Sequence, residues 1–113
     1  MDNCIFCKLI SGQIPCAKVY EDDWAFAFRD IAPQAPVHVI VVPKRHLANV
    51  LQADEAGEEL ARVMHAAAQV ARLEGLTESG FRMVTNCGAH GCQSEFHFHV
   101  HVLGGRQLAP ELG

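Results

Sequence analysis

The chain has 113 residues, of which 50% are hydrophobic and 19% are charged, and its formal net charge is −4. A chain of this length folds as one domain that can bury a core without disulfides. The acidic balance argues against binding to nucleic acid or to a membrane through a basic surface. No apolar run approaches the roughly 20 residues of a transmembrane helix, and residues 1–15 lack the basic and apolar regions of a signal peptide. We therefore expect a cytoplasmic protein with a single domain over residues 1–113.

The predicted elements are short strands arranged around one main helix. In chain order they are a short helix over residues 4–10, a hairpin of strands over 17–21 and 24–30, a strand over 37–43, a long helix over 54–74, and strands over 81–86 and 96–103. Strands separated by a single long helix predict the α+β class, with an antiparallel sheet covered on one side.

The long helix is predicted from apolar residues that recur at intervals of three and four. They are Leu60, Val63, Met64, Ala67, Val70 and Ala71. Asp54 is the expected N-cap, and Gly75 stands where a glycine commonly ends a helix.

Cysteine and histidine are the unusual part of the composition, with five of the first and seven of the second. An odd number of cysteines without a secretory signal argues against a disulfide framework. Other roles for these side chains must therefore be considered.

Three of the histidines alternate with apolar residues in the last predicted strand. Because side chains on a strand point to opposite faces in turn, His97, His99 and His101 should share one face while Phe98, Val100 and Val102 face the core. This face could consist of half-buried sheet residues, could bind a metal, or could carry a nucleophilic imidazole. His97 and His101 would lie about 13 Å apart along the strand, which disfavours one ion held by all three.

The loop before this strand is suited to an anion. Residues 86–94, NCGAHGCQS, combine glycines, which allow close backbone approach, with neutral hydrogen-bonding side chains. Together with three histidines, the loop indicates a site that handles phosphate.

These motifs resemble the histidine triad (HIT) family, and in particular its Hint-like branch. The run HFHVHVL over residues 97–103 matches the triad motif, and it is preceded by GCQS at 91–94 and followed by GGRQ at 104–107. Further similarity covers residues 27–38 and PKRH at 43–46. The resemblance implies the HIT fold, with a five-stranded, mainly antiparallel sheet, one long helix and a short N-terminal helix. It also implies a homodimer with a ten-stranded sheet.

The resemblance further implies a hydrolase that cleaves the P–N bond of purine nucleoside phosphoramidates or of adenylated lysine and releases AMP or GMP. His99 would be the nucleophile and become nucleotidylated, and His101 would bind the phosphate oxygens beside His97, the third member of the triad. Ser94 and Gln93 would contact the phosphate and the leaving group, and Asn86 the phosphate or ribose.

The same resemblance implies a nucleoside pocket. Asp30 would bind the ribose hydroxyls, and His38 would lie behind the triad. Apolar side chains would surround the purine base, namely Phe6, Leu9, Ile14, Phe28 and Ile31.

A zinc site is implied for the N-terminal Cys-x-x-Cys. Cys4 and Cys7 match, with His46 and His97, the Cys₂His₂ ligands of zinc-binding bacterial relatives, a set that suits a closed structural Zn²⁺ site. The alternative is that both thiols are reduced and metal-free. Cys16 and Cys87 are expected to be buried thiols without a role.

Two residues depart from the family pattern, Cys92 at a position usually occupied by Gly and Glu95 at a small or apolar one. Glu95 is expected to influence the imidazoles or the leaving-group side. Two other functions stay open: a zinc-dependent hydrolase that uses the histidine face as a catalytic metal site, and a nucleotide-binding regulatory protein with weak activity.

Overall fold

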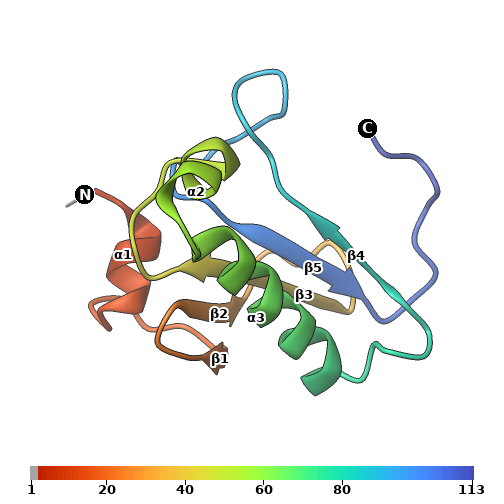
Figure 1. Cartoon of the computed structure of the whole chain (residues 1–113). Coiled ribbons are helices and arrows are strands. Elements are labelled where there is room, and N and C mark those ends of the chain that lie inside the picture. The colour runs from red at the N-terminus through yellow and green to blue at the C-terminus, as the bar shows by residue number, and fades with distance from the viewer. Residues whose placement is uncertain (1–2) are drawn as a thin grey trace.

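The computed structural model describes residues 3–113, which form one five-stranded sheet and three helices (Figure 1). The elements are α1 (Ile5–Ile10), β1 (Lys18–Glu21), β2 (Ala25–Arg29), β3 (Val37–Pro43), α2 (Val50–Ala56), α3 (Glu59–Leu73), β4 (Phe81–Val84) and β5 (Val100–Gly104). The strand order is β1-β2-β3-β5-β4, and every neighbouring pair is antiparallel. The predicted α+β class and five-stranded antiparallel sheet are confirmed.

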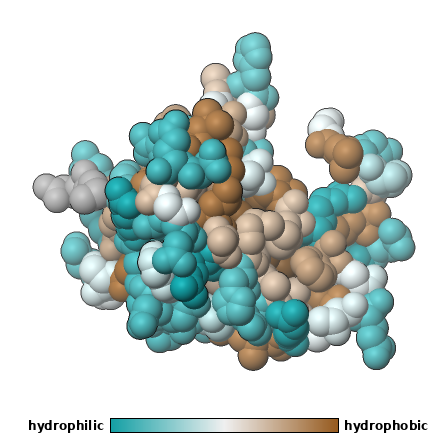
Figure 2. Space-filling model, in the orientation of Figure 1, coloured by the Kyte–Doolittle hydropathy of each residue, from teal (hydrophilic) through white to brown (hydrophobic). Residues whose placement is uncertain are grey.

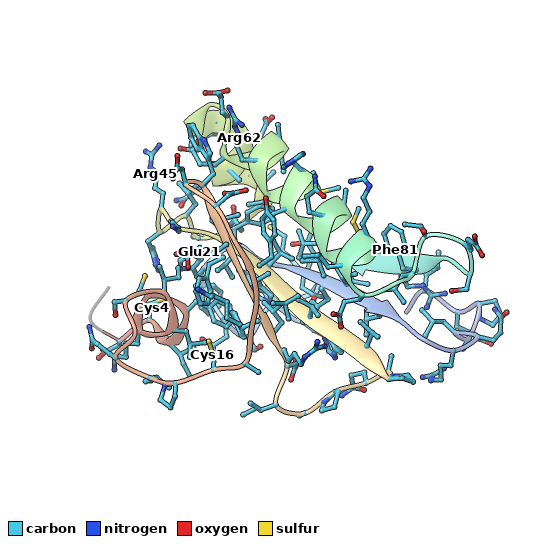
Figure 3. The ribbon with its side chains drawn as sticks, turned by 90° about the horizontal axis from the view of Figure 1, so that it is seen from below. Cys4, Cys16, Glu21, Arg45, Arg62 and Phe81 are labelled. Carbon is cyan, nitrogen blue, oxygen red and sulfur yellow. The ribbon has the colours of Figure 1, made fainter. Side chains whose placement is uncertain are left out.

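Both faces of the sheet are covered, because α1 and α3 lie on opposite sides of it (Figure 3). Along β3, Val39 and Val41 pack in the core beneath α3, whereas Ile40 and Val42 pack with Phe6 of α1. The second covered face explains why β3 is an uninterrupted apolar run instead of an alternating one. Our expectation of a sheet covered on one side only was therefore incomplete.

The β1–β2 hairpin forms as expected around Asp22. One carboxylate oxygen of Asp22 accepts hydrogen bonds from the backbone N–H groups of Trp24 and Ala25, at 2.7 and 2.8 Å. This side chain satisfies donors that the turn would otherwise leave free.

The single helix predicted over 54–74 is wrong, because the chain breaks it into α2 and α3 at Gly57. Gly57 has φ 123° and ψ −114°, a backbone conformation open almost only to glycine. Asp54 lies inside α2, whose N-cap is Asn49; the Asn49 side chain accepts from the N–H groups of Leu51 and Gln52.

The buried stripe of α3 is shifted relative to the prediction. Ala66 is buried together with Val63 and Val70, whereas Met64 is 40% exposed. Gly75 ends the helix as predicted, with φ 71°, and Leu76 N–H then donates to Ala71 O at 2.9 Å. Among residues 3–113, no helix has the length and apolarity needed to cross a bilayer.

The last two strands are shorter than predicted, since β4 ends at Val84 and β5 begins only at Val100. Phe98 donates its N–H to Leu47 O, a loop carbonyl, in place of a strand partner. The alternation nevertheless holds, with Phe98 and Val102 buried in the core beneath α3. His97 and His99 therefore lie in an irregular segment just before β5.

Gly57→Ala should destabilise the protein by about 1–3 kcal/mol, because a Cβ is strained at this positive φ. Urea unfolding measures the effect, with Gly113→Ala as control, since a Cβ at Gly113 would meet nothing within 4 Å. Equal unfolding midpoints for Gly57→Ala and the wild type would show that the α2–α3 break does not depend on glycine.

Candidate active site

A cavity of about 570 Å³ opens on the α1 side of the sheet, a size typical of small-molecule sites. Its walls come from α1, the segment after it, β2, β3, the loop after β4 and the start of β5. The cavity brings together most of the residues expected to bind nucleotide, namely Phe6, Leu9, Ile14, Phe28, Asp30, Ile31, Asn86, Ser94, His99 and His101.

The apolar part of the cavity rests on the packing of α1 against the sheet. The rings of Phe6 and Phe28 lie 5.7 Å apart between centroids, and Phe6 also meets the His99 ring edge-on at 5.0 Å. Ile40 lines the same wall, directly opposite Phe28 in the β2–β3 register. Sequence reasoning missed Ile40, although strand alternation places it on the same face as His38.

His99 presents one nitrogen to the cavity. Its Nδ1 lies 2.8 Å from the carbonyl oxygen of His97, an acceptor, so Nδ1 carries the proton and donates it. The Nε2 lone pair is then free. Thr85 Oγ1 donates to the His99 carbonyl at 2.7 Å, which holds the backbone at His99 in place.

The proton position on His101 follows from a chain of hydrogen bonds behind it. Gln34 N–H donates to His38 Nδ1 at 3.0 Å, so the His38 proton is on Nε2, and Nε2–H donates to His101 Nδ1 at 2.8 Å. His101 must therefore carry its own proton on Nε2, ready to donate to an anion. Asp30 Oδ2 lies 3.4 Å from His38 Nε2 and adds a negative charge to this chain. His38 does not line the cavity itself, but it contacts His101 and Asp30, which do.

His101 is uncharged near neutral pH. Burial lowers its pKa to about 4, and the neighbouring rings of His99 and His38 add to the effect, while Asp30 opposes it. Burial likewise lowers the pKa of His38. A neutral His101 keeps both its acceptor nitrogen toward His38 and its donor toward the cavity.

The stability of the protein should fall as the pH is lowered from 6.5 toward 4, partly because of His101. The unfolded histidine takes up a proton near pH 6.5 and the folded one only near pH 4, so the unfolded chain binds more protons within this window. The contribution of His101 is at most about 1.4 kcal/mol per pH unit. Urea unfolding between pH 7 and 4.5 should give a shallower pH slope for His101→Gln than for the wild type. Identical slopes would contradict a buried neutral His101.

The loop after β4 is held by its own amide side chains. Asn86 Nδ2 donates to Gly91 O at 2.6 Å. Gln93 accepts from Gly88 N–H at 3.0 Å and donates to the carbonyls of Ala48 and Glu95 at 2.7 and 3.0 Å. Gln93 is buried and does not line the cavity, and its amide holds the loop through these three bonds.

His97 is also absent from the cavity wall, because it is completely buried beneath α1. Its Nε2–H donates to Pro43 O at 2.9 Å, which leaves the Nδ1 lone pair facing Cys4 and Cys7. His97 therefore faces Cys4 and Cys7 with its ring and His99 with its carbonyl.

Cys4, Cys7, His46 and His97 form a cluster whose ligand atoms all lie within 4.8 Å of one another. The sulfur–nitrogen separations are 3.3 Å from Cys4 to His97, 3.3 Å from Cys7 to His46 and 3.6 Å from Cys7 to His97. Sulfur and nitrogen ligands of one tetrahedral zinc lie about 3.6 Å apart. The four residues therefore fit a closed zinc site that joins α1 to the triad.

A metal ion in this cluster would displace the proton of the Cys7 thiol. Burial raises the pKa of the Cys7 thiol to about 11, and the adjacent Cys4 contributes. Two neighbouring thiolates are costly without a cation, and a bound metal removes that cost.

Asp30, His38 and His101 are a second group with metal-compatible spacing. There the facing nitrogens of His38 and His101 share a proton at 2.8 Å, which a metal would have to displace.

The remaining cysteines differ partly from expectation. Cys16 is exposed on the segment between α1 and β1, so the prediction of a buried thiol is wrong (Figure 3). Cys92 is exposed, lines the cavity and has φ 62°, a left-handed conformation that explains why glycine suits this position. Cys87 is partly buried.

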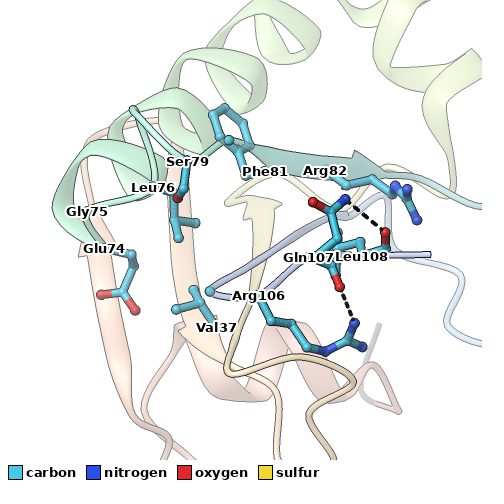
Figure 4. Close-up of a pocket in the computed structure, with 12 residues that line it drawn as sticks. Val37, Glu74, Gly75, Leu76, Ser79, Phe81, Arg82, Arg106, Gln107 and Leu108 are labelled. Carbon is cyan, nitrogen blue, oxygen red and sulfur yellow. Dashed lines mark hydrogen bonds between the residues drawn. The ribbon is translucent and has the colours of Figure 1, made fainter. Parts of the chain in front are cut away.

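A second cavity of about 480 Å³ lies at the other end of the sheet (Figure 4). Its guanidinium groups hold backbone carbonyls: Arg82 donates to Ala109 O, and Arg106 donates to Gln34 O and Gln107 O. These contacts anchor the C-terminal segment, and none of the described residues in the wall is a histidine or cysteine. The candidate active site is therefore the cavity beside His99.

Comparison with known proteins agrees with this assignment. The HIT domain family matches residues 11–108. The chain is 50% identical over 107 residues to the 14 kDa zinc-binding protein of Brassica juncea, covering 92% of this chain and 94% of that protein. It is 43% identical over 109 residues to the purine nucleoside phosphoramidase of Escherichia coli (strain K12), covering 96% and 92%.

A solved structure shows the same fold. The crystal structure of a HIT family hydrolase from Legionella pneumophila Philadelphia 1 superposes with a TM-score of 0.92 at 45% identity, covering 98% of this chain and 100% of that one. The chain therefore belongs to the HIT domain family and is a hydrolase of that family.

Proposed function

We propose that this protein hydrolyses the P–N bond of purine nucleoside phosphoramidates, or of adenylated lysine, through a nucleotidyl-His99 intermediate. The observation that carries the proposal is the free Nε2 of His99, held toward the cavity by the 2.8 Å bond from its Nδ1 to His97 O. The 43% identity to a purine nucleoside phosphoramidase supports the substrate class.

The nucleotide would lie along the cavity. The base would pack among the apolar side chains of α1 and β2, including Phe6 and Phe28. Asp30 would accept hydrogen bonds from the ribose hydroxyls: its Oδ1 accepts from Ala32 N–H at 2.8 Å, and Oδ2 lies beside His38. Ser94 and Asn86 border the space in front of His99, where the phosphate would lie.

The reaction would proceed in two displacements at phosphorus. His99 Nε2 attacks the α-phosphorus and the P–N bond breaks, so the amine leaves with a proton taken from solvent. Water then attacks the same phosphorus and breaks the P–Nε2 bond; its proton goes to solvent and the lone pair returns to Nε2. His101 Nε2–H would donate to a phosphate oxygen throughout and stabilise the charge that develops there.

A bound zinc would supply structural cross-linking rather than chemistry in this scheme. Cys4, Cys7, His46 and His97 would hold it, and none of them lines the cavity. The ring of His97, and with it the carbonyl that orients His99, would be fixed more firmly in place.

We also infer a homodimer of one-domain subunits that acts in the cytoplasm on AMP- or GMP-containing substrates. Hydrophobic side chains gather on the face that carries α3 and β4 (Figure 2), where Met64, Phe81 and Met83 are each about 40% exposed. β4 is an edge strand, so its free backbone groups can pair with a second β4 and extend the sheet to ten strands. Free cysteines at every described position suit a reducing compartment.

The proposal is tested with a fluorogenic adenosine 5′-phosphoramidate. The wild type should release AMP and free amine in equal amounts. Quenching during the first turnover with denaturant at alkaline pH, where the P–N bond to histidine is stable, should yield a peptide with AMP attached at His99, identified by mass spectrometry. Binding of AMP without turnover would favour the regulatory alternative and overturn the proposal. Turnover without an adenylated peptide would overturn the covalent step.

A further inference from the structure

Glu95 places an unpaired carboxylate on the wall of the active-site cavity. It follows Ser94 directly, is exposed, and lines the cavity together with His99 and His101. Within residues 3–113, its carboxylate oxygens have no hydrogen-bond or ion-pair partner; its one polar contact is the backbone carbonyl, which accepts from Gln93 Nε2 at 3.0 Å. A hydrogen bond therefore holds the main chain at Glu95, while the carboxylate remains available to bind a ligand.

The charge balance of the cavity makes this carboxylate unusual. Of the described residues, Arg29 is the one lysine or arginine that lines the cavity, and its guanidinium is already bound to Glu74 at 2.5 and 3.1 Å. His101 is neutral, since its pKa lies near 4. A cavity that takes an anionic phosphate thus carries an added negative charge with no protein cation to offset it, which disfavours the substrate unless the substrate brings its own cation.

The location of Glu95 indicates which part of the substrate it would meet. The apolar wall from α1 and β2 and the carboxylate of Asp30 occupy the nucleoside end, and Glu95 lies with Ser94 on the loop that ends at the triad. In an in-line displacement the leaving group departs from the side of phosphorus opposite to His99 Nε2. The exposed side chain of Glu95 borders the same cavity as His99, so a leaving group that extends into the cavity can meet it.

We infer that Glu95 is a specificity-determining residue that selects phosphoramidates whose amine leaving group carries a second, positively charged amine. This inference rests on the proposed function and names the leaving-group class within it. Glu95 attracts the cation in both the ground state and the transition state, so its effect lies mainly in KM. The attraction weakens with ionic strength because the pair is open to solvent.

The test uses two substrates of matched size. One is AMP joined through its phosphorus to one nitrogen of 1,4-diaminobutane, which leaves a free ammonium; the other is AMP joined to n-pentylamine, which is neutral. The wild type should prefer the cationic substrate by about twofold to fivefold in kcat/KM, the range expected for a partly exposed ion pair. Glu95→Gln should bring the ratio to about one while the rate for the neutral substrate stays the same or rises.

A control variant and a charge reversal sharpen the result. Glu78→Gln removes an exposed carboxylate outside the cavity and should keep the wild-type ratio. Glu95→Lys should disfavour the cationic substrate and favour AMP joined to 4-aminobutanoate. If both substrates are turned over but the ratio of their kcat/KM values is the same in the wild type and in Glu95→Gln, the inference is overturned and the proposed function stands. No turnover of any of the three compounds would overturn both.

Discussion

Replacing His99 by glutamine should lower kcat for an adenosine phosphoramidate by at least about 10⁴-fold, the scale seen when a covalent nucleophile is removed. The amide of glutamine can fill the space of the imidazole beside Phe6, but it has no nitrogen lone pair able to attack phosphorus. The fold should survive, because the backbone contact between Thr85 Oγ1 and the His99 carbonyl does not involve the ring. Steady-state release of AMP and the far-ultraviolet circular dichroism spectrum measure the two effects.

His38→Gln is the matched comparison for this variant. It removes the ring that fixes the proton of His101 but leaves His99 and the cavity wall intact. We expect a smaller loss of about 10- to 100-fold, together with continued formation of nucleotidyl-His99. If His99→Gln kept activity within tenfold of the wild type, another group would have to be the nucleophile.

Cys7→Ser should abolish stoichiometric zinc binding and lower the free energy of unfolding by about 3 kcal/mol, or roughly 10 °C in Tm for a domain of this size. Cys7 faces both His46 and the buried His97, at 3.3 and 3.6 Å, so its loss opens the cluster at its centre. The segment of α1 would lose its link to the chain before β5. Zinc content by mass spectrometry and thermal unfolding measure the result.

Cys16→Ser is the control, because Cys16 is exposed and outside the cluster. A strong chelator should lower the Tm of the wild type and of Cys16→Ser but have no effect on Cys7→Ser. Chelated wild-type protein assayed below its new Tm should retain turnover; complete loss of turnover with the fold retained would support the alternative of a catalytic metal. A wild-type protein that is purified without zinc and does not respond to added zinc would contradict the site.

Sequence reasoning succeeded where the signal is local. The alternation around Phe98 and Val102 predicted the buried face of β5, and the glycine at position 75 predicted the end of α3. Sequence reasoning did not predict the break between α2 and α3. The apolar period continues on both sides of Gly57 and carries no information about the φ of 123° at that residue. The predicted last strand began too early, at residue 96. Phe98 donates its N–H to the loop carbonyl of Leu47 and not to a neighbouring strand, and the sequence gives no sign of this distant contact.

The candidate site divides in the same way. The sequence and its family resemblance together indicated the residue types that line the cavity, and a Cys-x-x-Cys whose partners were His46 and His97. Sequence reasoning did not predict three features. Gln93 and His97 do not line the cavity, the thiol of Cys16 is exposed, and the carboxylate of Glu95 is unpaired. Each depends on how many neighbours surround a side chain, which no spacing in the chain specifies.

By itself, the sequence determined which chemical groups are present: a mildly acidic chain, three histidines at alternate positions, and two thiols near the N-terminus. Only the tertiary structure decided their tautomers, their burial and their pKa values. The proton of His99 is placed by a carbonyl two residues away, but that of His101 is placed by His38, which is 63 residues distant, and by Gln34 behind it. The physical reason is that a side-chain period is a property of the local backbone, whereas tautomers, burial and pKa values depend on contacts that form only when distant segments pack together.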